Sequence, residues 1–386
     1  LTEFQALPEI DGVLDHDRPI TNPVDDPVMR VIDGAARPLR LGRGDAPLEW
    51  TLPKPVDRPT LALGGQMKVT LALAWGDRAV VSAHIGDLDS PAALAAFIEQ
   101  ADRMQHMYGI RAEQLICDHH PDYQSHHWAR NQPLPWIEVP HHKAHASALM
   151  ADTEMDEPAL VFVWDGMGLG DDKALWGGEA FYGQPGQWRR VGSLLPFPLP
   201  GGERASREPW RCALGLALAA GHPWRPASIP EADTHLIEAA WQQGLNCPPT
   251  HSVGRLFDAA AAFCGLGKAI SHEGQAAMWL ESLADADSPA LPLAWQDHEA
   301  LALLDWRPLL PLLADSKHPV ADRAGIFHAS LAEAMVDLAE RLQARYPAKY
   351  VGLSGGVFQN RLLCERACRS LRQAGFTPLL HKRIPC

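Results

Sequence analysis

The densest group of potential metal ligands in the sequence is His141-His142-Lys143-Ala144-His145. Side chains three or four residues apart lie on the same face of a helix, so His145 can meet either His141 or His142 at one ion. Two imidazoles leave room for a carboxylate, and such sites bind Zn or Fe(II) with positions open for substrate. The segment therefore predicts a metal site, and the alternative is a set of surface histidines that only form hydrogen bonds.

Two glycine-rich segments each follow a predicted strand. The first, DGMGLG at 165–170, comes after the apolar run ALVFVW. Its glycines let backbone N–H groups approach a phosphate, and Asp165 could hold a metal or a hydroxyl group. The alternative for this segment is a tight hairpin that binds no ligand.

The second glycine-rich segment is SGGVFQN at 354–360, between a predicted strand and a predicted helix. Backbone N–H groups at the start of a helix favour an anion, so the segment predicts a seat for a phosphate or a nucleotide. It is not a Walker A loop, because no GKS or GKT follows. The GxSxG pattern of a nucleophile elbow is also absent, which argues against Ser354 as a nucleophile.

Other reactive side chains have a structural interpretation. Cys364 and Cys368 are one helical turn apart within a leucine-patterned helix, which favours core packing over metal binding. Cys117 precedes an Asp-His pair, but nothing near it in the sequence orients a thiol and an imidazole together. A polar loop carries four further histidines, for which hydrogen bonding is favoured over a ligand role: His119, His120, His126 and His127.

These segments require strands and helices to position them. Alternation around Gly76-Asp77 predicts a β-hairpin over 67–87, and a helical period follows over 90–107. Strand patterns end in polar clusters near 118, 140 and 165, and again at 349–356, where α/β proteins commonly bind ligands. Alanine- and leucine-rich patterns predict further helices over 255–266, 274–286, 327–346 and 359–375. Two units of strand and glycine loop, one in each half, predict two α/β lobes that face a shared cleft.

Composition restricts the class of protein. The 386 residues are 46% hydrophobic and 21% charged, which is typical of a folded globular chain of two or three domains. A net charge of -13 argues against nucleic-acid binding, because such proteins usually carry a basic surface. Seven cysteines without a CxxC pair, and no apolar run of about 18 residues, predict a cytoplasmic protein that does not cross a membrane.

The motifs occur in an order that resembles one family. HHKAH, DGMGLGDD, REPWR, GRLFDAAAAFCGL, HEGQAA and SGGVFQN follow one another as in the C-terminal region of HypF carbamoyltransferases, which supply carbamoyl groups for nickel-iron hydrogenase maturation. The resemblance runs from about Leu61 to the end, and this region of the family is similar to tRNA threonylcarbamoyl transferases. It implies an α/β actin-like ATPase fold with a nucleotide cleft between a first lobe over 60–195 and a second over 196–386. The proline-rich arm 1–59, with HDRPITNPVDDPVMR at 16–30, resembles the tail of a YrdC-like adenylation domain.

The resemblance also assigns roles to residues. It implies metal ligation and metal-assisted catalysis by His141, His145 and Asp165, with His142 a neighbour of the site. The positions that it assigns to the nucleotide are Trp164, Asp165, Gly166, Met167, Gly168, Asp258, Gly274, Gly355, Gly356 and Asn360.

Two differences from the family pattern affect these expectations. In the family, the helix after SGGVFQN leads to a strand and an NDGG-type loop whose aspartate completes the metal site, whereas this sequence ends at HKRIPC. The sequence as given would therefore supply one ligand fewer. The acylphosphatase domain, the cysteine zinc modules and most of the adenylating domain of the family are also not in it.

By this resemblance, the cofactors are a divalent metal and ATP or carbamoyl-adenylate. The carbamoyl group would pass to the C-terminal cysteine of a HypE-type acceptor protein, and adenylation would need a YrdC-like domain in cis or in trans. Two other functions stay open: O-carbamoylation of a small molecule, and nucleotide binding by a subunit without activity. The REPWR motif favours the hydrogenase branch over the small-molecule branch.

Overall fold

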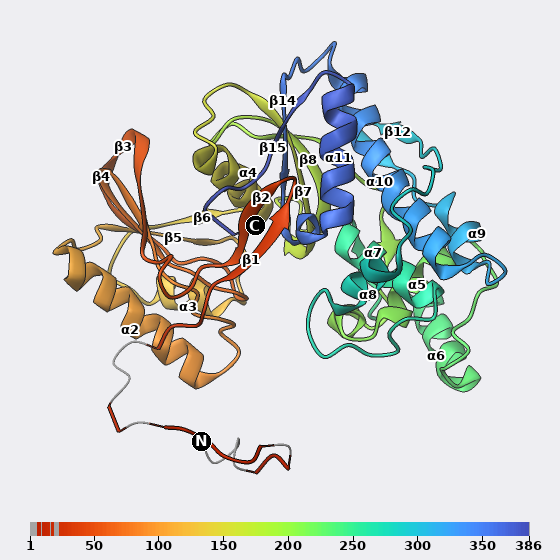
Figure 1. The fold of residues 1–386 in the computed structure, drawn as a ribbon, viewed down its shortest axis with the longest axis horizontal. Coiled ribbons are helices and arrows are strands. Elements are labelled where there is room, and N and C mark those ends of the chain that lie inside the picture. The colour runs from red at the N-terminus through yellow and green to blue at the C-terminus, as the bar shows by residue number, and fades with distance from the viewer. Residues whose placement is uncertain (1–5, 9, 16, 19–22, 386) are drawn as a thin grey trace.

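The computed structural model describes residues 6–8, 10–15, 17–18 and 23–385. Part of the segment 16–30 compared with the YrdC-like domain, at 16 and 19–22, lies outside the described residues. The chain forms two α/β lobes, each built on its own sheet (Figure 1). Within the described part, no helix is both long and apolar enough to span a bilayer.

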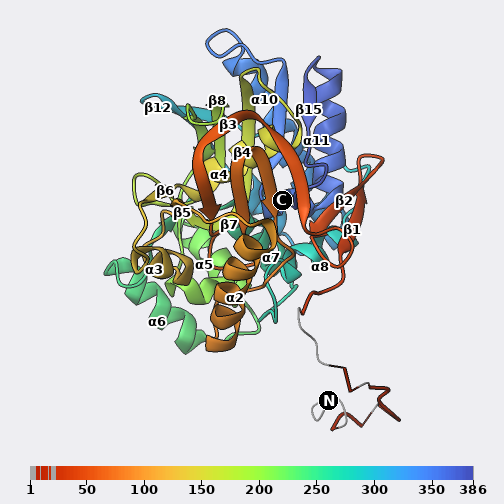
Figure 2. The ribbon, with the colours of Figure 1, turned by 90° about the vertical axis from the view of Figure 1, so that its left-hand side faces the viewer.

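The first lobe is a four-stranded sheet in the order β4-β3-β5-β6. β3 is antiparallel to β4 and parallel to β5, which is parallel to β6. Figure 2 shows this lobe from its side of the molecule, with α2 below the sheet. Its elements are β3 (Leu48–Ala62), β4 (Ala72–Val81), α2 (Pro91–Tyr108), β5 (Gln114–Asp118), α3 (Gln124–Arg130) and β6 (Trp136–Val139).

The predicted helix at 90–107 is confirmed as α2, and local sequence explains its ends. Ser90 caps its N-terminus by accepting a hydrogen bond from the Ala93 N–H, with Pro91 in the first turn. Gly109 ends the helix in the left-handed conformation at φ 65°. Phe97 and Ala101 bury the inner face of the helix against the sheet.

The hairpin predicted over 67–87 is wrong in its turn. Gly76 lies inside the continuous strand β4, opposite Val56 of β3. β3 also begins at Leu48, within the arm that the sequence predicted to be irregular up to residue 59. The residues before and after Gly76 do not pair with each other as a hairpin would require. Both parts belong to β4, which pairs with the preceding strand β3.

The arm contributes a second ordered piece, the hairpin of β1 (Val28–Ile32) and β2 (Ala35–Arg40). Although it precedes the first lobe in sequence, it packs on the second (Figures 1 and 2). Arg30 pairs with Glu281 at 2.8 Å. The Arg37 guanidinium donates to the backbone oxygen of His381.

The second lobe has a nine-stranded sheet, with β12-β13-β9-β8-β7-β14-β15 as its main path. The predicted strand at 349–356 is confirmed as β14, which is parallel to both β7 and β15. The strands of this nine-stranded sheet are β7 (Ala159–Leu169), β8 (Leu175–Gly183), β9 (Arg189–Leu194), β10 (Phe197–Pro198), β11 (Pro249–Thr250), β12 (Trp295–His298), β13 (Leu301–Leu304), β14 (Tyr350–Ser354) and β15 (Thr377–Leu379).

Helices cover both faces of this sheet. α4 (His141–Asp152) packs on one face against β7 and β14. The predicted helices of the C-terminal half are confirmed on the opposite, larger core. The remaining helical elements are η1 (Gly202–Ser206), α5 (Pro209–Ala219), α6 (Glu231–Gln242), α7 (Val253–Phe263), α8 (Gln275–Leu283), α9 (Leu309–Ala314), α10 (Val320–Leu342), η2 (Gly356–Gln359) and α11 (Arg361–Gln373).

The two sheets divide between β6 and β7, and not after residue 195, the predicted lobe boundary. β7, β8 and β9 hydrogen-bond into the second sheet because β14, far along the chain, pairs with β7. The segment 159–194 therefore belongs to the second sheet.

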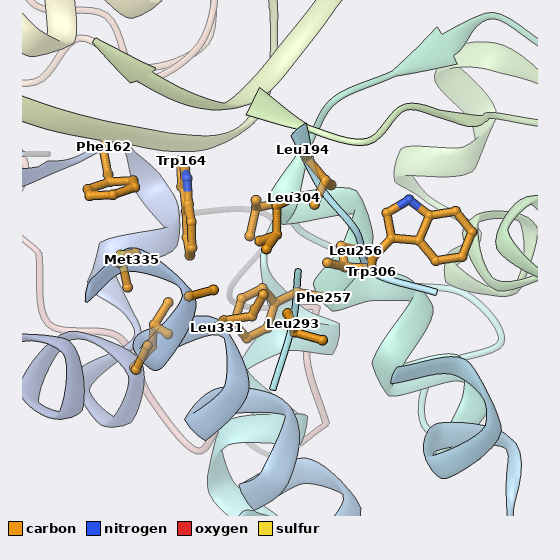
Figure 3. Packing of buried hydrophobic residues seen from close by; sticks show 14 of the residues in the cluster. Phe162, Trp164, Leu194, Leu256, Phe257, Leu293, Leu304, Trp306, Leu331 and Met335 are labelled. Atoms are coloured by element: carbon orange, nitrogen blue, oxygen red, sulfur yellow. The ribbon is translucent and has the colours of Figure 1, made fainter. Parts of the chain in front are cut away.

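A large aromatic core fixes the second lobe (Figure 3). Phe257 and Phe327 meet edge to face with ring centroids 4.8 Å apart. Trp164 is fully buried and stacks on Phe358, with centroids 5.5 Å apart. These contacts hold β7, α7 and the loop after β14 in fixed relative positions.

The Asp152 carboxylate anchors the segment after β15. Its Oδ2 accepts backbone hydrogen bonds from Lys382 at 2.6 Å, Arg383 at 3.0 Å and Ile384 at 3.2 Å. Burial would raise the pKa of Asp152, but the His381 contact and these amides lower it to about 2. The charged carboxylate therefore stabilises the fold above about pH 4, and this contribution is lost as the pH falls towards 2.

We expect Asp152→Asn to lower the free energy of unfolding by about 1–2 kcal/mol at pH 7, because an amide accepts these hydrogen bonds weakly. The difference from wild type should shrink between pH 4 and pH 2. Urea unfolding at several pH values measures it, with the exposed Asp156→Asn as control. A difference that does not change with pH would contradict this account.

Candidate functional site

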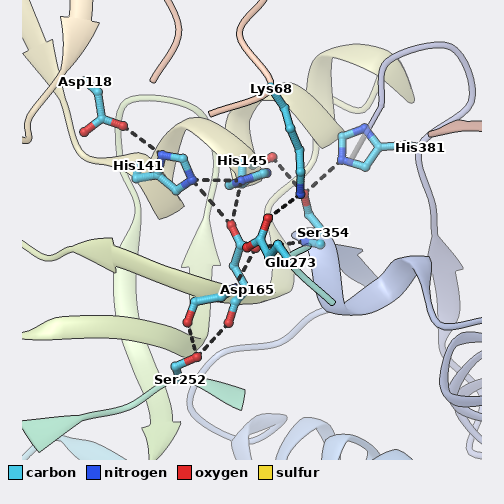
Figure 4. A network of polar contacts seen from close by, with 11 residues as sticks. Lys68, Asp118, His141, His145, Asp165, Ser252, Glu273, Ser354 and His381 are labelled. Atoms are coloured by element: carbon cyan, nitrogen blue, oxygen red, sulfur yellow. Dashed lines mark hydrogen bonds and ion pairs between the residues drawn. The ribbon is translucent and has the colours of Figure 1, made fainter. Parts of the chain in front are cut away.

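Three predicted metal ligands meet where α4 and β7 come together (Figure 4). α4 begins at His141, directly after Pro140, and the helical spacing places His145 on the same face. The Nε2 atoms of the two histidines are 3.2 Å apart. Asp165 Oδ2 lies 3.4 Å from His141 Nε2 and 3.3 Å from His145 Nε2. The structure thus brings together two imidazoles and one carboxylate that are separate in the sequence.

The donor set fits a divalent metal. One ligand atom from each of His141, His145 and Asp165 lies within 4.8 Å of the other two. Two imidazoles and a carboxylate on one side of an ion are typical of Zn or Fe(II) sites with open positions.

Asp118, at the end of β5, orients the first ligand. Its Oδ2 lies 2.8 Å from His141 Nδ1. A proton on Nδ1 leaves the lone pair of Nε2 directed at the site, as in many carboxylate–histidine–metal arrangements. Sequence reasoning did not assign this role to Asp118. The available signal was its position at the end of a strand next to β6, which leads into α4.

Backbone groups hold the other half of the Asp165 carboxylate. Its Oδ1 accepts hydrogen bonds from the N–H of Gly166 at 2.8 Å and of Gly356 at 3.2 Å. Gly355, at φ 97°, lies so close to β7 that a Cβ there would be 2.3 Å from the Trp164 carbonyl oxygen. The paired glycines of SGG therefore allow the loop after β14 to reach Asp165.

The charges of the cluster are strongly coupled. Burial would lower the pKa of His141, but its hydrogen bonds with Asp118 and Asp165 raise it to about 10. Burial would raise the pKa of Asp165, but its contacts with His141 and His145 hold it well below the usual range. A proton on His141 thus balances the carboxylates at the place where a cation would lie.

His142 faces away from the cluster. It is fully buried, its ring centroid is 6.0 Å from that of Trp176, and burial holds its pKa well below the usual value. A Cβ on Gly168 would lie 2.7 Å from its Cε1. Gly168 therefore makes room for His142 and lines neither of the cavities described below.

The four histidines at 119–127 form other contacts, and His126 and His127 lie on α3 and not in the predicted polar loop. His119 Nδ1 lies 2.7 Å from Glu138 Oε2, and His126 Nδ1 lies 3.0 Å from the Asp118 backbone oxygen. Within the described residues, none of the four joins a metal-binding group. The cysteines are also structural, since Cys364 and Cys368 are buried on α11, and burial raises the pKa of Cys117 to about 11.

A cavity in the second lobe adjoins the cluster. It lies between α7, α8, β7 and η2, with Arg30 and Leu39 of the β1–β2 hairpin on one side. We call it the second-lobe cavity. Six of the predicted nucleotide residues line it: Asp165, Gly166, Asp258, Gly274, Gly356 and Asn360.

Two of these lining residues have internal partners. Asp258 Oδ2 is 3.0 Å from Arg255 Nη2, and although Arg255 opposes the effect, burial raises the pKa of Asp258 to about 6. Asn360 caps α11 by accepting from the Leu363 N–H and also contacts His328, both at 2.9 Å. The side chain of Asn360 therefore shapes the cavity wall.

The other predicted nucleotide positions lie elsewhere. Trp164 is buried in the core of the second lobe and is not on the wall of the second-lobe cavity. Gly355 is on neither cavity wall, and it allows the loop after β14 to pass close to the Trp164 backbone. Met167 faces a second cavity, the first-lobe cavity, whose lining includes His141 and His145.

Sequence reasoning missed several charged residues at these cavities, among them Arg30, Lys68 and Glu281. Arg30 and Glu281 pair across the second-lobe cavity, and Lys68 lines both cavities. They come from segments far apart in the chain, so no local motif identifies them.

We expect Asp118→Asn to weaken Zn²⁺ binding by about 10- to 100-fold. The amide introduced by this change can donate to His141 Nδ1, which would favour the tautomer with a proton on Nε2, facing the ion. A competitive titration with a chromophoric chelator measures the affinity. Asp122→Asn, an exposed change in the same loop, is the control. Equal affinities in both variants would contradict the orienting role of Asp118.

The chain resembles one family of known proteins along most of its length. A family model for the HypF Kae1-like domain matches residues 55–152, and a model for the second subdomain of the carbamoyltransferase Kae1-like domain matches 161–386. Carbamoyltransferase HypF of Synechocystis sp. is 36% identical over 100% of this chain and 52% of that protein. The HypF of Rhizobium leguminosarum is 38% identical over 97% of this chain and 49% of that protein. This chain thus spans about half the length of these relatives.

A shorter relative and two crystal structures agree. A carbamoyltransferase HypF homolog of Cupriavidus necator is 35% identical over 87% of this chain and 90% of that protein. Full-length HypF in a phosphate- and nucleotide-bound form superposes with a TM-score of 0.91 at 32% identity, over 97% of this chain and 60% of that one. T. kodakarensis HypF superposes with a TM-score of 0.85 at 25% identity, over 94% of this chain and 50% of that one. The predicted two-lobed α/β fold is confirmed, and the chain belongs to the HypF carbamoyltransferase family.

Proposed function

We propose that this chain transfers a carbamoyl group from carbamoyl-adenylate to the C-terminal cysteine of a HypE-type acceptor protein. The observation that carries the proposal is the juxtaposition of His141, His145 and Asp165 with a cavity that suits a nucleotide. Membership of the HypF family and likeness to a nucleotide-bound HypF support it.

The adenosine part would occupy the second-lobe cavity. Phe257, Ala277, Met278 and Val357 provide apolar wall for a base, and carboxylates lie nearby for ribose hydroxyl groups. The phosphate would lie towards Gly166 and Gly356, beside the first turn of α7. Backbone N–H groups at a helix start favour an anion there.

The transfer step needs a carbamoyl carbon held between a leaving phosphate and an incoming thiolate. The thiolate forms the new S–C bond, the C–O bond to phosphate breaks, and the electron pair leaves with AMP. A divalent metal bound to the three ligands would stabilise charge on the leaving phosphate. Asp118 and the amides of Gly166 and Gly356 hold those ligands in place. The first-lobe cavity would admit the acceptor, because its wall includes His141, His145 and Asp165.

Elemental analysis tests the metal half of the proposal. We expect about one Zn or Fe per chain after purification with that metal, and loss of it in His145→Ala because one of three ligands is removed. His127→Ala, on the exposed side of α3, should keep wild-type content. A wild-type chain without metal would favour the alternative of an inactive nucleotide-binding subunit.

An acceptor assay tests the transfer half. With carbamoyl phosphate, ATP and a HypE-type acceptor, we expect carbamoylation only when a YrdC-like adenylating domain is present, because that domain would make the adenylate. His145→Ala should lower the rate by about 10²-fold or more. Mass spectrometry of the acceptor thiol gives the measurement. Full-rate transfer without the adenylating domain would refute the division of labour, and a carbamoylated hydroxyl compound would favour the small-molecule alternative.

A further inference from the structure

The second-lobe and first-lobe cavities meet at a shared wall. The lining residues common to both are Leu39, Lys68, Asp165, Glu273 and Gly356. A ligand that extends from the second-lobe cavity to the metal cluster must therefore pass these side chains. Lys68 and Glu273 are the oppositely charged pair among them.

Lys68 and Glu273 join the two lobes across this passage (Figure 4). Lys68 lies in the loop before β4, and Glu273 lies just before α8. The Lys68 Nζ is 2.6 Å from Glu273 Oε2, with the side chains 56% and 32% exposed. Pairs exposed to this extent contribute roughly 0–1 kcal/mol, so a competing anion can separate them.

The backbone of Lys68 is held in a particular conformation. Its φ is 52°, in the left-handed region that non-glycine residues rarely adopt. Its N–H donates to Asp87 Oδ1 at 2.7 Å. The surrounding loop thus fixes the point from which the ammonium reaches the cavity.

The two guanidinium groups that line the second-lobe cavity are less exposed than Lys68, at 33% for the Arg30 side chain and 4% for that of Arg255. Arg30 donates to both Glu281 and the Gln359 backbone oxygen at 2.8 Å. Arg255 is buried beside Asp258. The ammonium of Lys68 has three N–H donors, and its hydrogen-bond partner among the described residues is Glu273.

We infer that Lys68 binds the nucleotide phosphate and that Glu273 is the anion which this phosphate replaces. The inference rests on the proposed function and deepens it, because it assigns a phosphate-specific residue within the same site. Four carboxylates line the second-lobe cavity, at 165, 258, 273 and 281. A phosphate entering beside them needs a cation that can leave its present partner.

Binding of AMP and of adenosine separates this role from a purely structural one. We expect Lys68→Met to weaken AMP binding by about 10- to 100-fold, the size of a charge-assisted hydrogen bond, and to leave adenosine binding unchanged. Glu273→Gln should strengthen AMP binding severalfold, since the ammonium then has a weaker competitor. Isothermal titration at one fixed Zn²⁺ concentration measures all three proteins.

Arg78→Met provides the matched control. Arg78 on β4 forms a similarly exposed pair with Glu49 on β3 at 2.7 Å, and it lines neither cavity. This variant should bind both ligands as wild type does. The inference is overturned if Lys68→Met leaves AMP binding unchanged, or weakens AMP and adenosine equally, or if Glu273→Gln weakens AMP binding as Lys68→Met does. A wild-type chain that binds neither ligand would overturn the proposed nucleotide site and this inference together.

Discussion

The two oxygens of the Asp165 carboxylate face different parts of the protein, and the site depends on this division. Oδ1 is held by the amides of Gly166 on β7 and Gly356 in the loop after β14. β7 and β14 are neighbouring parallel strands of the second sheet. Oδ2 faces the two histidines of α4. A small movement of either strand would rotate the carboxylate, so the packing of the second-lobe core directly controls the geometry of the metal cluster.

The position of α4 has a similar double constraint. Its chain enters from β6 of the first sheet, but its apolar side, with Leu149 and Met150, packs on the second sheet. The helix start therefore lies beside Asp118 at the end of β5, while the helix body is fixed against β7 and β14. This arrangement lets one sheet orient His141 and the other hold its partner Asp165.

Local patterns in the sequence predicted much of this arrangement. The helical spacing of His141 and His145 and the glycines next to Asp165 are signals carried within a few residues, and the structure brings these groups together. The turn at Gly76 was wrong because the same alternation suits a long strand paired with an earlier one. The roles of Asp118 and Lys68 could not be predicted, since they arise from contacts between distant segments.

The β1–β2 hairpin has a mechanical consequence. It is covalently attached to β3 of the first lobe through residues 41–47, yet Arg30 and Arg37 fasten it to the second lobe. The polypeptide therefore crosses between the lobes twice, once here and once between β6 and β7. Two crossings restrain twisting more strongly than a single hinge. Any relative rotation of the lobes must therefore bend both connecting segments or release the hairpin.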